Sequence, residues 1–317
     1  MAEPIVSIIM PAYNAQKFIQ QTIDSVKNQI FTQWELIITN DGSTDDTLNI
    51  IQENINSDSR ICVITQINAK QAAARNSAIK KARGELLAFI DADDTWMPNK
   101  LSIQTGVFSA NKDVDVVYSG GAMVYSDGRS STRYPTEFGL FEGKEMYQKL
   151  YRSNIIPNLS VVFRKKWIYN IGLQDESAEL VGCEDWEYWI RLAKAGCVFL
   201  GLNMDLFNYR VHSESMSNNL VQMKRAELFA LYKNLESSEF KKTFAKERIG
   251  SLAADLIPKM FINGKREQAI SVSALLMRIN HNIRFTILYW YLKIIKPHNY
   301  RIVEWLLDPK KKIKEGR

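Results

Sequence analysis

Between residues 5 and 90 the chain alternates short apolar runs with amphipathic stretches, and this alternation constrains the fold more than any other feature. The amphipathic stretches carry apolar side chains at helical spacing, as Ile19, Ile23 and Val26 do in the first of them. Strand-like runs that alternate with helices predict consecutive βαβ units, which build a parallel sheet through right-handed crossovers. The expected strands cover residues 5–10, 35–39, 61–65 and 86–90.

Polar side chains follow three of these four strands. Tyr13 and Asn14 follow the first, Asp41 follows the second, and the cluster Asp91-Ala92-Asp93-Asp94 follows the fourth. In open α/β sheets, ligands bind beyond the carboxyl ends of the strands. We therefore expect these groups, which are distant in the sequence, to converge on one rim.

The cluster 91–94 admits two interpretations. Acidic residues before a helix are often only caps, and Met97-Pro98 makes a good helix opening here. Three acids in four positions exceed what one cap requires, and a cation would relieve their mutual repulsion. Hard oxygen ligands suit Mg²⁺ or Mn²⁺, so the cluster predicts a divalent metal site that would neutralise a diphosphate.

Asp41 and Arg75 each have a structural and a functional interpretation. Asp41 lies in an Asp-Gly turn before a helix start, but a carboxylate at a strand end also accepts hydrogen bonds from a nucleobase or ribose. Arg75 would ordinarily form a surface salt bridge, although near the rim it would pair with phosphate or base. Both alternatives stay open at this point.

Asp185 follows Glu184 at the start of an expected helix over residues 186–195. Negative charge there is favoured by the helix dipole alone. A carboxylate in this place could also act as a general base, with Trp186 and Trp189 as an aromatic wall for a sugar ring. His212 is either an ordinary histidine or a ligand for metal or phosphate.

Composition sets the broad class. A chain of 317 residues with 46% hydrophobic residues can bury a large core. The net charge of +6, with lysines gathered in residues 310–314, suits an anionic partner and leaves both a membrane surface and a nucleic acid open. Three cysteines without metal spacing, no visible secretory leader, and an apolar run over 285–292 that is too short to span a bilayer predict a cytoplasmic protein.

The last third of the chain changes character. Helical patterns replace strand-like runs from about Leu220, so we expect domains over residues 1–217 and 218–317, with the boundary near residues 217–219. Near the end, apolar residues at helical spacing are flanked by aromatic and basic side chains. This pattern is typical of an interfacial helix at a membrane surface, or of a helix packed on its own domain or on a second subunit. The apolar residues are Phe285, Leu288, Leu292 and Ile295, with Tyr289, Trp290 and Tyr291 nearby and Arg284, Lys293 and Lys296 beside them.

Taken in order, these motifs resemble the family-2 glycosyltransferases. The resemblance covers residues 5–215 and rests on Val6-Ser7-Ile8-Ile9-Met10-Pro11-Ala12-Tyr13-Asn14, Asn40-Asp41-Gly42-Ser43-Thr44-Asp45, Ala74-Arg75-Asn76, Asp91-Ala92-Asp93-Asp94, Glu184-Asp185-Trp186 and Tyr209-Arg210-Val211-His212. It implies the GT-A fold, a Rossmann-like, mostly parallel mixed sheet flanked by helices, here followed by a helical C-terminal region. It also implies an inverting transfer of a hexosyl or N-acetylhexosaminyl group from a nucleotide donor, with UDP expected, to a saccharide or lipid-linked saccharide in surface polysaccharide synthesis.

The resemblance also implies residue roles. Asp185 would be the catalytic base, Asp93 and His212 would hold Mn²⁺ or Mg²⁺, and the remaining positions would bind the nucleotide. Those positions are Pro11, Tyr13, Asp41, Arg75, Asp91 and Ala92. Nucleic acid is not an expected partner, whereas peripheral contact with the inner face of the plasma membrane and oligomerisation through the C-terminal helices are both open.

The sequence departs from the family pattern at two points, and two other functions are compatible with it. Asn40 stands where many relatives have a second acid, which leaves base selection open, and the Gln-x-x-Arg-Trp signature of processive synthases is absent, which favours single addition. Asp93 and Asp185 could instead be the carboxylate pair of a glycoside hydrolase. The chain could also be a non-catalytic module that binds a sugar nucleotide or a membrane surface.

Overall fold

A computed structural model describes residues 3–125, 129, 131–216, 219–235, 242–279, 283–294 and 300–307. The chain divides into two compact units, unit 1 over Met1–Ser215 and unit 2 over Met216–Arg317. Residues 217 and 218 of the expected boundary lie outside the described residues, as do Ile295, Lys296 and the lysine-rich residues 310–314.

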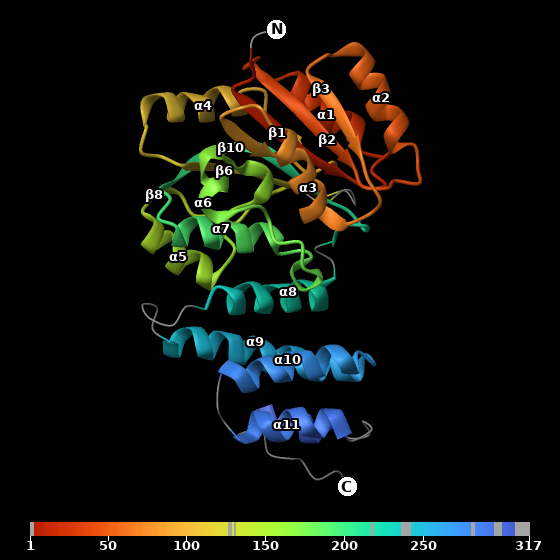
Figure 1. Ribbon diagram of the computed structural model, residues 1–317, viewed down its shortest axis with the longest axis vertical. Helices are drawn as coiled ribbons and strands as arrows, with labels where there is room; N and C mark the ends of the chain where they lie inside the picture. Colours follow the sequence, from red (N-terminus) through yellow and green to blue (C-terminus); the bar gives the residue numbers. More distant parts are fainter. Residues whose placement is uncertain are drawn as a thin grey trace. The chain divides into compact units, whose positions relative to one another are not determined.

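Unit 1 is built on one mixed sheet (Figure 1). Its strand order is β3-β2-β1-β4-β9-β6-β10-β5, with β7 paired to β6 and β8 to β10. Strands β3, β2, β1 and β4 are mutually parallel, and β9 runs antiparallel to both β4 and β6. The strands are β1 (Val6–Ala12), β2 (Trp34–Asn40), β3 (Ile61–Thr65), β4 (Leu86–Phe89), β5 (Thr95–Trp96), β6 (Val116–Tyr125), β7 (Thr132–Arg133), β8 (Gly139–Phe141), β9 (Val162–Arg164) and β10 (Phe199–Val211).

The four expected parallel strands are confirmed, and so is the mostly parallel sheet flanked by helices. The second half of the sheet is less regular. Residues 158–160 form a 3₁₀ turn, η1 (Asn158–Ser160), and β9 starts only at Val162. Strand β10 was not foreseen, because register shifts near Asp205 interrupt the alternation that marks a strand.

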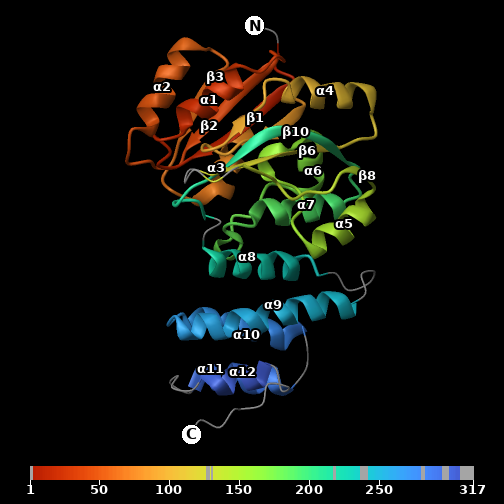
Figure 2. The same ribbon diagram turned by 180° about the vertical axis from the view of Figure 1, so that it is seen from behind.

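Helices cover both faces of the sheet (Figures 1 and 2). Apolar side chains of α1, α2 and α4 share one core with alternate residues of β1, β2 and β4. On the opposite face α3 packs on β1 and β2, and Trp189 of α7 meets Phe89 of β4. The helices of unit 1 are α1 (Ile19–Lys27), α2 (Thr47–Ser57), α3 (Lys70–Lys81), α4 (Lys100–Ala110), α5 (Gly143–Arg152), α6 (Ile168–Ile171) and α7 (Glu184–Lys194), with the 3₁₀ turns η2 (Lys165–Trp167) and η3 (Ala178–Leu180).

Burial on both faces explains why β1 and β2 read as nearly continuous apolar runs, since every residue of both strands is buried. Helix α3 approaches the sheet through the small side chains of Ala74 and Ala78, which are fully buried. This close approach places Arg75, on the same helix, inside the protein rather than on its surface.

The regular elements in the described part of unit 2 are all helices (Figure 2). In α11, Leu288 and Leu292 are fully buried, and this helix packs on α10 and α12. No described helix is both long enough and apolar enough to cross a membrane. The helices are α8 (Leu220–Lys233), α9 (Lys242–Ile262), α10 (Arg266–Ile279), α11 (Ile283–Ile294) and α12 (Tyr300–Leu307).

Candidate active site

The turn after β4 holds the three acids of the cluster 91–94 in a fixed arrangement. The hydroxyl of Thr22 in α1 lies 2.9 Å from the carbonyl oxygen of Ala92 and 2.7 Å from that of Asp94. Asp94 is 1% exposed, and its Oδ1 accepts a hydrogen bond of 2.7 Å from the backbone N–H of Arg210. Its Oδ2 is buried without a partner. Burial and the charges of Asp93 and Asp91 raise the pKa of Asp94 well above its usual range.

Asp93 pairs with His212, the residue that follows β10. The distance from His212 Nε2 to Asp93 Oδ2 is 3.0 Å, and the imidazole lies against the ring of Phe18, with 4.7 Å between the ring centroids. Burial, followed by the charge of Asp91, raises the pKa of Asp93. The fold therefore brings together the two residues expected to bind metal, although they are 119 positions apart in the sequence.

Arg75 forms a buried bridge between the turn that holds the cluster 91–94, called the acid turn below, and the first turn of α7. Its guanidinium donates hydrogen bonds of 2.7 Å to Asp91 and 2.8 Å to Glu184. Asn158 also donates to Asp91, at 3.3 Å, and the backbone N–H of Gly182 donates to Glu184 at 2.8 Å. With 2% of Arg75 exposed, the interpretation of this residue as a surface salt bridge is wrong. The bridge fixes the acid turn relative to the start of α7.

Asp185 lies in the first turn of α7, which begins at Glu184, two residues before the expected start. The carboxylate is partly exposed and accepts a hydrogen bond of 2.7 Å from the backbone N–H of Trp186. Burial and the charge of Glu184 raise the pKa of Asp185 to about 7, against the lowering effect of Arg75. A carboxylate with such a pKa can take up a proton near neutral pH, as a general base must.

The tryptophans beside Asp185 do not form the expected aromatic wall. Trp186 is 4% exposed and donates its indole N–H to the carbonyl oxygen of Leu150 at 2.8 Å. Trp189 is fully buried among Phe89, Phe163 and Tyr188. Both point into the core because α7 lies on the sheet, so neither can stack on a sugar.

Tyr13 and Asp41 follow residues that are directly paired in the sheet, because Ala12 of β1 lies opposite Asn40 of β2. Tyr13 is exposed, at 52%. Asp41 is buried and accepts hydrogen bonds from the Gln66 side chain at 2.8 Å and from the N–H groups of Ala69 at 2.8 Å and Lys70 at 2.9 Å. Asp41 thereby anchors the loop that begins α3.

The other two expected nucleotide-binding residues, Pro11 in β1 and Ala92 in the acid turn, are both buried. Three contacts of the rim could not be predicted from the sequence. Arg210 acts on Asp94 through a backbone N–H, which almost any residue supplies, and Phe18 and Asn158 belong to no recognisable motif.

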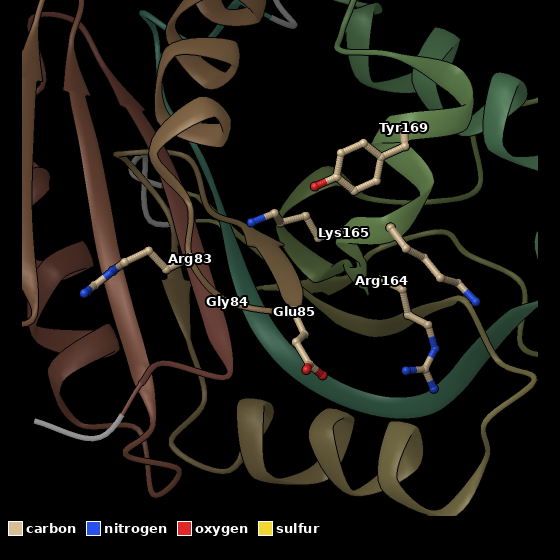
Figure 3. A pocket seen from close by; sticks show the side chains of 7 residues that line it. Arg83, Gly84, Glu85, Arg164, Lys165 and Tyr169 are labelled. Carbon is tan, nitrogen blue, oxygen red and sulfur yellow. The ribbon is translucent and has the colours of Figure 1, made fainter.

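A second charged region lies at the other end of β4, where a hollow of about 280 Å³ is lined mainly by basic residues (Figure 3). Arg164 donates to the carbonyl oxygens of Val114, Phe108 and Asn111, and Lys165 donates to that of Ala82 at 2.6 Å. The remaining two cations form ion pairs, Arg83 with Glu35 and Lys166 with Asp115. The lining residues are Arg83, Gly84, Glu85, Arg164, Lys165, Lys166 and Tyr169.

Comparison with known proteins adds family information to this geometry. The profile of the family described as "Glycosyl transferase family 2" matches residues 7–172. The "Putative teichuronic acid biosynthesis glycosyltransferase TuaG" of Bacillus subtilis is 31% identical over 76% of this chain and 92% of its own length. The "UDP-Glc:alpha-D-GlcNAc-diphosphoundecaprenol beta-1,3-glucosyltransferase WfgD" of Escherichia coli is 33% identical over 69% of this chain and 82% of its own length.

Solved structures support the fold. TarS residues 1–349 of S. aureus, in complex with UDP-GlcNAc, align with a TM-score of 0.62 at 17% identity, covering 95% of this chain and 89% of that one. The mannosyltransferase PcManGT of Pyrobaculum calidifontis, in complex with GDP-Man and Mn²⁺, aligns with a TM-score of 0.59 at 16% identity, covering 97% and 85%. These likenesses confirm the expected fold class.

Proposed function

The chain belongs to glycosyl transferase family 2, and from that premise we propose that it moves a sugar from a UDP-sugar to a lipid-linked saccharide, with inversion at the anomeric carbon. Family membership makes it a transferase, which decides against the hydrolase and the non-catalytic module. The observation that carries the finer proposal is the buried Arg75 bridge, which joins Asp91 of the acid turn to Glu184, the neighbour of Asp185. The bridge thus connects the proposed leaving-group site to the residue beside the proposed base.

Asp185 is the proposed base. Its carboxylate removes the proton from an acceptor hydroxyl, whose oxygen then attacks the anomeric carbon from the face opposite the diphosphate. The bond between that carbon and the diphosphate oxygen breaks, and the nucleoside diphosphate leaves with the electron pair. Arg75 orients the base through Glu184, and in this arrangement the guanidinium is already occupied by two carboxylates.

Asp93 and His212 are the residues we propose for Mn²⁺ or Mg²⁺. A carboxylate and an imidazole suit these ions, and in the residue next to Asp93 the buried Oδ2 of Asp94 has no hydrogen-bond partner within the protein. Among the described residues there is no group of three or more His, Cys, Asp or Glu side chains placed for a metal ion, so diphosphate oxygens would complete the coordination. When bound, such an ion neutralises charge on the departing diphosphate.

The nucleoside end of the donor is proposed to lie over β1 and β2. Tyr13 offers an exposed ring for the nucleobase, and Asp41 retains acceptor capacity beyond its three hydrogen bonds. Asp91 would contact the ribose, while buried Pro11 and Ala92 would shape the backbone that the nucleotide meets.

The acceptor class follows from the relatives, one of which is named for teichuronic acid biosynthesis and the other for a diphosphoundecaprenol-linked GlcNAc acceptor. A lipid-linked acceptor would place the enzyme at the inner face of the plasma membrane. In α11 the residues Ile287 and Trp290 are each 49% exposed and lie one turn apart, with Lys293 5.2 Å from the Trp290 ring. We propose that this face contacts anionic lipid, since aromatic and basic groups together suit the headgroup region.

Vesicle sedimentation tests the membrane contact. Vesicles of anionic phospholipid should carry the protein down at low salt and release it at high salt, and Trp290→Ala should weaken the binding. Absence of sedimentation at low salt would remove this proposal, and a salt-independent dimer that forms through α11 would identify a second copy as the occupant of the face.

Calorimetry with UDP tests the central proposal. We expect binding that is strengthened by Mn²⁺ and that loses this dependence in Asp93→Ala. A transfer assay with radiolabelled UDP-glucose and UDP-GlcNAc on a short-chain GlcNAc-diphosphate lipid then tests the reaction itself. A protein that binds neither UDP nor another nucleoside diphosphate would contradict the proposed donor class.

A further inference from the structure

Tyr134 follows the short strand β7 and is fixed in place from two sides. Its backbone N–H donates to the carbonyl oxygen of Gly121 in β6 at 2.8 Å. Its ring meets the rings of Phe207 and Tyr209 in β10 edge-on, with centroid distances of 5.9 Å and 5.7 Å. Edge-to-face contacts of this kind favour one orientation of the half-buried ring.

Strand β10 links Tyr134 to the turn that holds Asp94. Tyr209, on which the ring packs, directly precedes Arg210, whose N–H holds Asp94 of the acid turn. Burial, followed by Tyr209 and then by the charges of Asp185 and Asp94, raises the pKa of the Tyr134 phenol above its usual range.

We propose that Tyr134, packed against Tyr209, is the aromatic wall on which the ring of the acceptor saccharide stacks. In this position a hydroxyl group of the saccharide would reach Asp185. A sugar presents an apolar C–H face, and this face suits an aromatic ring that is already oriented. The acceptor is assigned, rather than the donor, because the base acts on the acceptor hydroxyl. This inference rests on the proposed function, and it supplies the wall that the buried Trp186 and Trp189 cannot provide.

Two variants separate the ring from its hydroxyl. Tyr134→Ala removes the stacking surface, so KM for a short-chain GlcNAc-diphosphate lipid should rise about tenfold, while KM for the UDP-sugar stays unchanged. Tyr134→Phe keeps the ring and should remain within about threefold of wild type for both substrates. Tyr169→Ala is the matched control, since this tyrosine is 84% exposed at the distant basic hollow and its loss should change neither constant.

A direct binding measurement keeps the inference independent of turnover. Saturation-transfer NMR with GlcNAc 1-phosphate, recorded with and without UDP, should show contact with the sugar ring protons in wild type and in Tyr134→Phe but not in Tyr134→Ala. Calorimetry with UDP on the same samples reports the proposed function separately.

The outcomes are distinct. An unchanged signal in Tyr134→Ala, or no ring contact in a wild type that binds UDP, overturns the inference and leaves the donor site standing. Equal loss of UDP and saccharide binding in Tyr134→Ala shows a structural role and also overturns it. A wild type that binds the saccharide through Tyr134 but binds no nucleotide supports the wall and overturns the proposed donor instead.

Discussion

The two ends of β4 carry opposite charge and treat it differently. At the carboxyl end, Asp91, Asp93, Asp94 and Asp185 crowd around the Arg75 bridge, and burial and mutual repulsion raise the pKa values of Asp93, Asp94 and Asp185. At the other end, each cation that lines the basic hollow has partners that use its charge or its hydrogen bonds. The acids at the carboxyl end therefore repel one another, whereas the cations at the other end are matched by partners within the fold.

This difference distinguishes a region that binds a ligand from a region whose charges only stabilise the fold. Charge that a protein leaves uncompensated costs stability, and it is retained where a substrate or ion completes the arrangement. Charge that is matched within the fold needs no ligand. Lys165, which donates to Ala82 just beyond α3, and Arg164, which donates to Asn111 just beyond α4, act on helix C-termini, where positive charge is favourable.

The largest effect is expected from removing the base. Asp185→Asn keeps the shape but cannot take up the acceptor proton, so kcat should fall about 10²- to 10⁴-fold while UDP affinity is retained. Initial rates and calorimetry measure the two quantities. Asp113→Asn makes the same chemical change at an exposed position and should be neutral. Full turnover in Asp185→Asn would show that Asp185 is not the base and that its raised pKa has no catalytic meaning.

The next largest effect concerns the bridge. Arg75→Met leaves Asp91 and Glu184 without their cation, and breaking a buried ion pair typically costs about 3–5 kcal/mol of unfolding free energy. Arg75→Lys should recover only part of this, because one ammonium cannot match the guanidinium fork. Lys17→Met is the control, since Lys17 makes a 2.7 Å pair with Glu214 in which both side chains are exposed, and exposed pairs of this kind add little to stability. Equal destabilisation of Arg75→Met and Lys17→Met in denaturant titrations would contradict the structural role of the bridge.

Sequence patterns predicted the parallel half of unit 1 because periodicity and strand ends are local properties. The positions of Tyr13, Asp41 and Asp91 follow from that half by topology alone. The sequence did not show that Arg75 is buried, because its burial depends on the small alanines that bring α3 close to the sheet. Nor did it reveal β10, whose irregular register conceals the strand that carries Tyr209 and Arg210 and leads to His212. Long-range partners of this kind have no local signature.

A third expectation is a pH dependence. Because the pKa of Asp185 is raised to about 7, log kcat/KM should rise with unit slope below that value and level off above it. The sign for stability is opposite. Protonated Asp185 is the form that burial favours, so its contribution to stability is present at low pH and is lost as the pH rises through about 7.

Asp185→Asn provides the internal check on this expectation. The variant should gain thermal stability relative to wild type between about pH 6 and pH 8, while UDP binding by wild type, measured over the same range, shows whether donor binding contributes to the rate profile. A kcat/KM that is flat from about pH 5 to pH 9 would count against Asp185 as the base.

The smallest effect is expected from a substitution at the basic hollow, where the charges are already paired within the fold. Lys165→Met removes a charge that only assists the C-terminus of α3, so the loss should be about 0.3–1 kcal/mol, or ~1–4 °C in Tm, with no change in kcat or in either KM. Thermal unfolding and initial rates measure both. The expectation follows because the Nζ group donates to a carbonyl of the fold, so no ligand is needed to compensate its burial. If Lys165→Met kept its Tm but lost transferase activity, the paired cations of the hollow would have a role beyond stabilising the fold. The hollow would then be a second functional site.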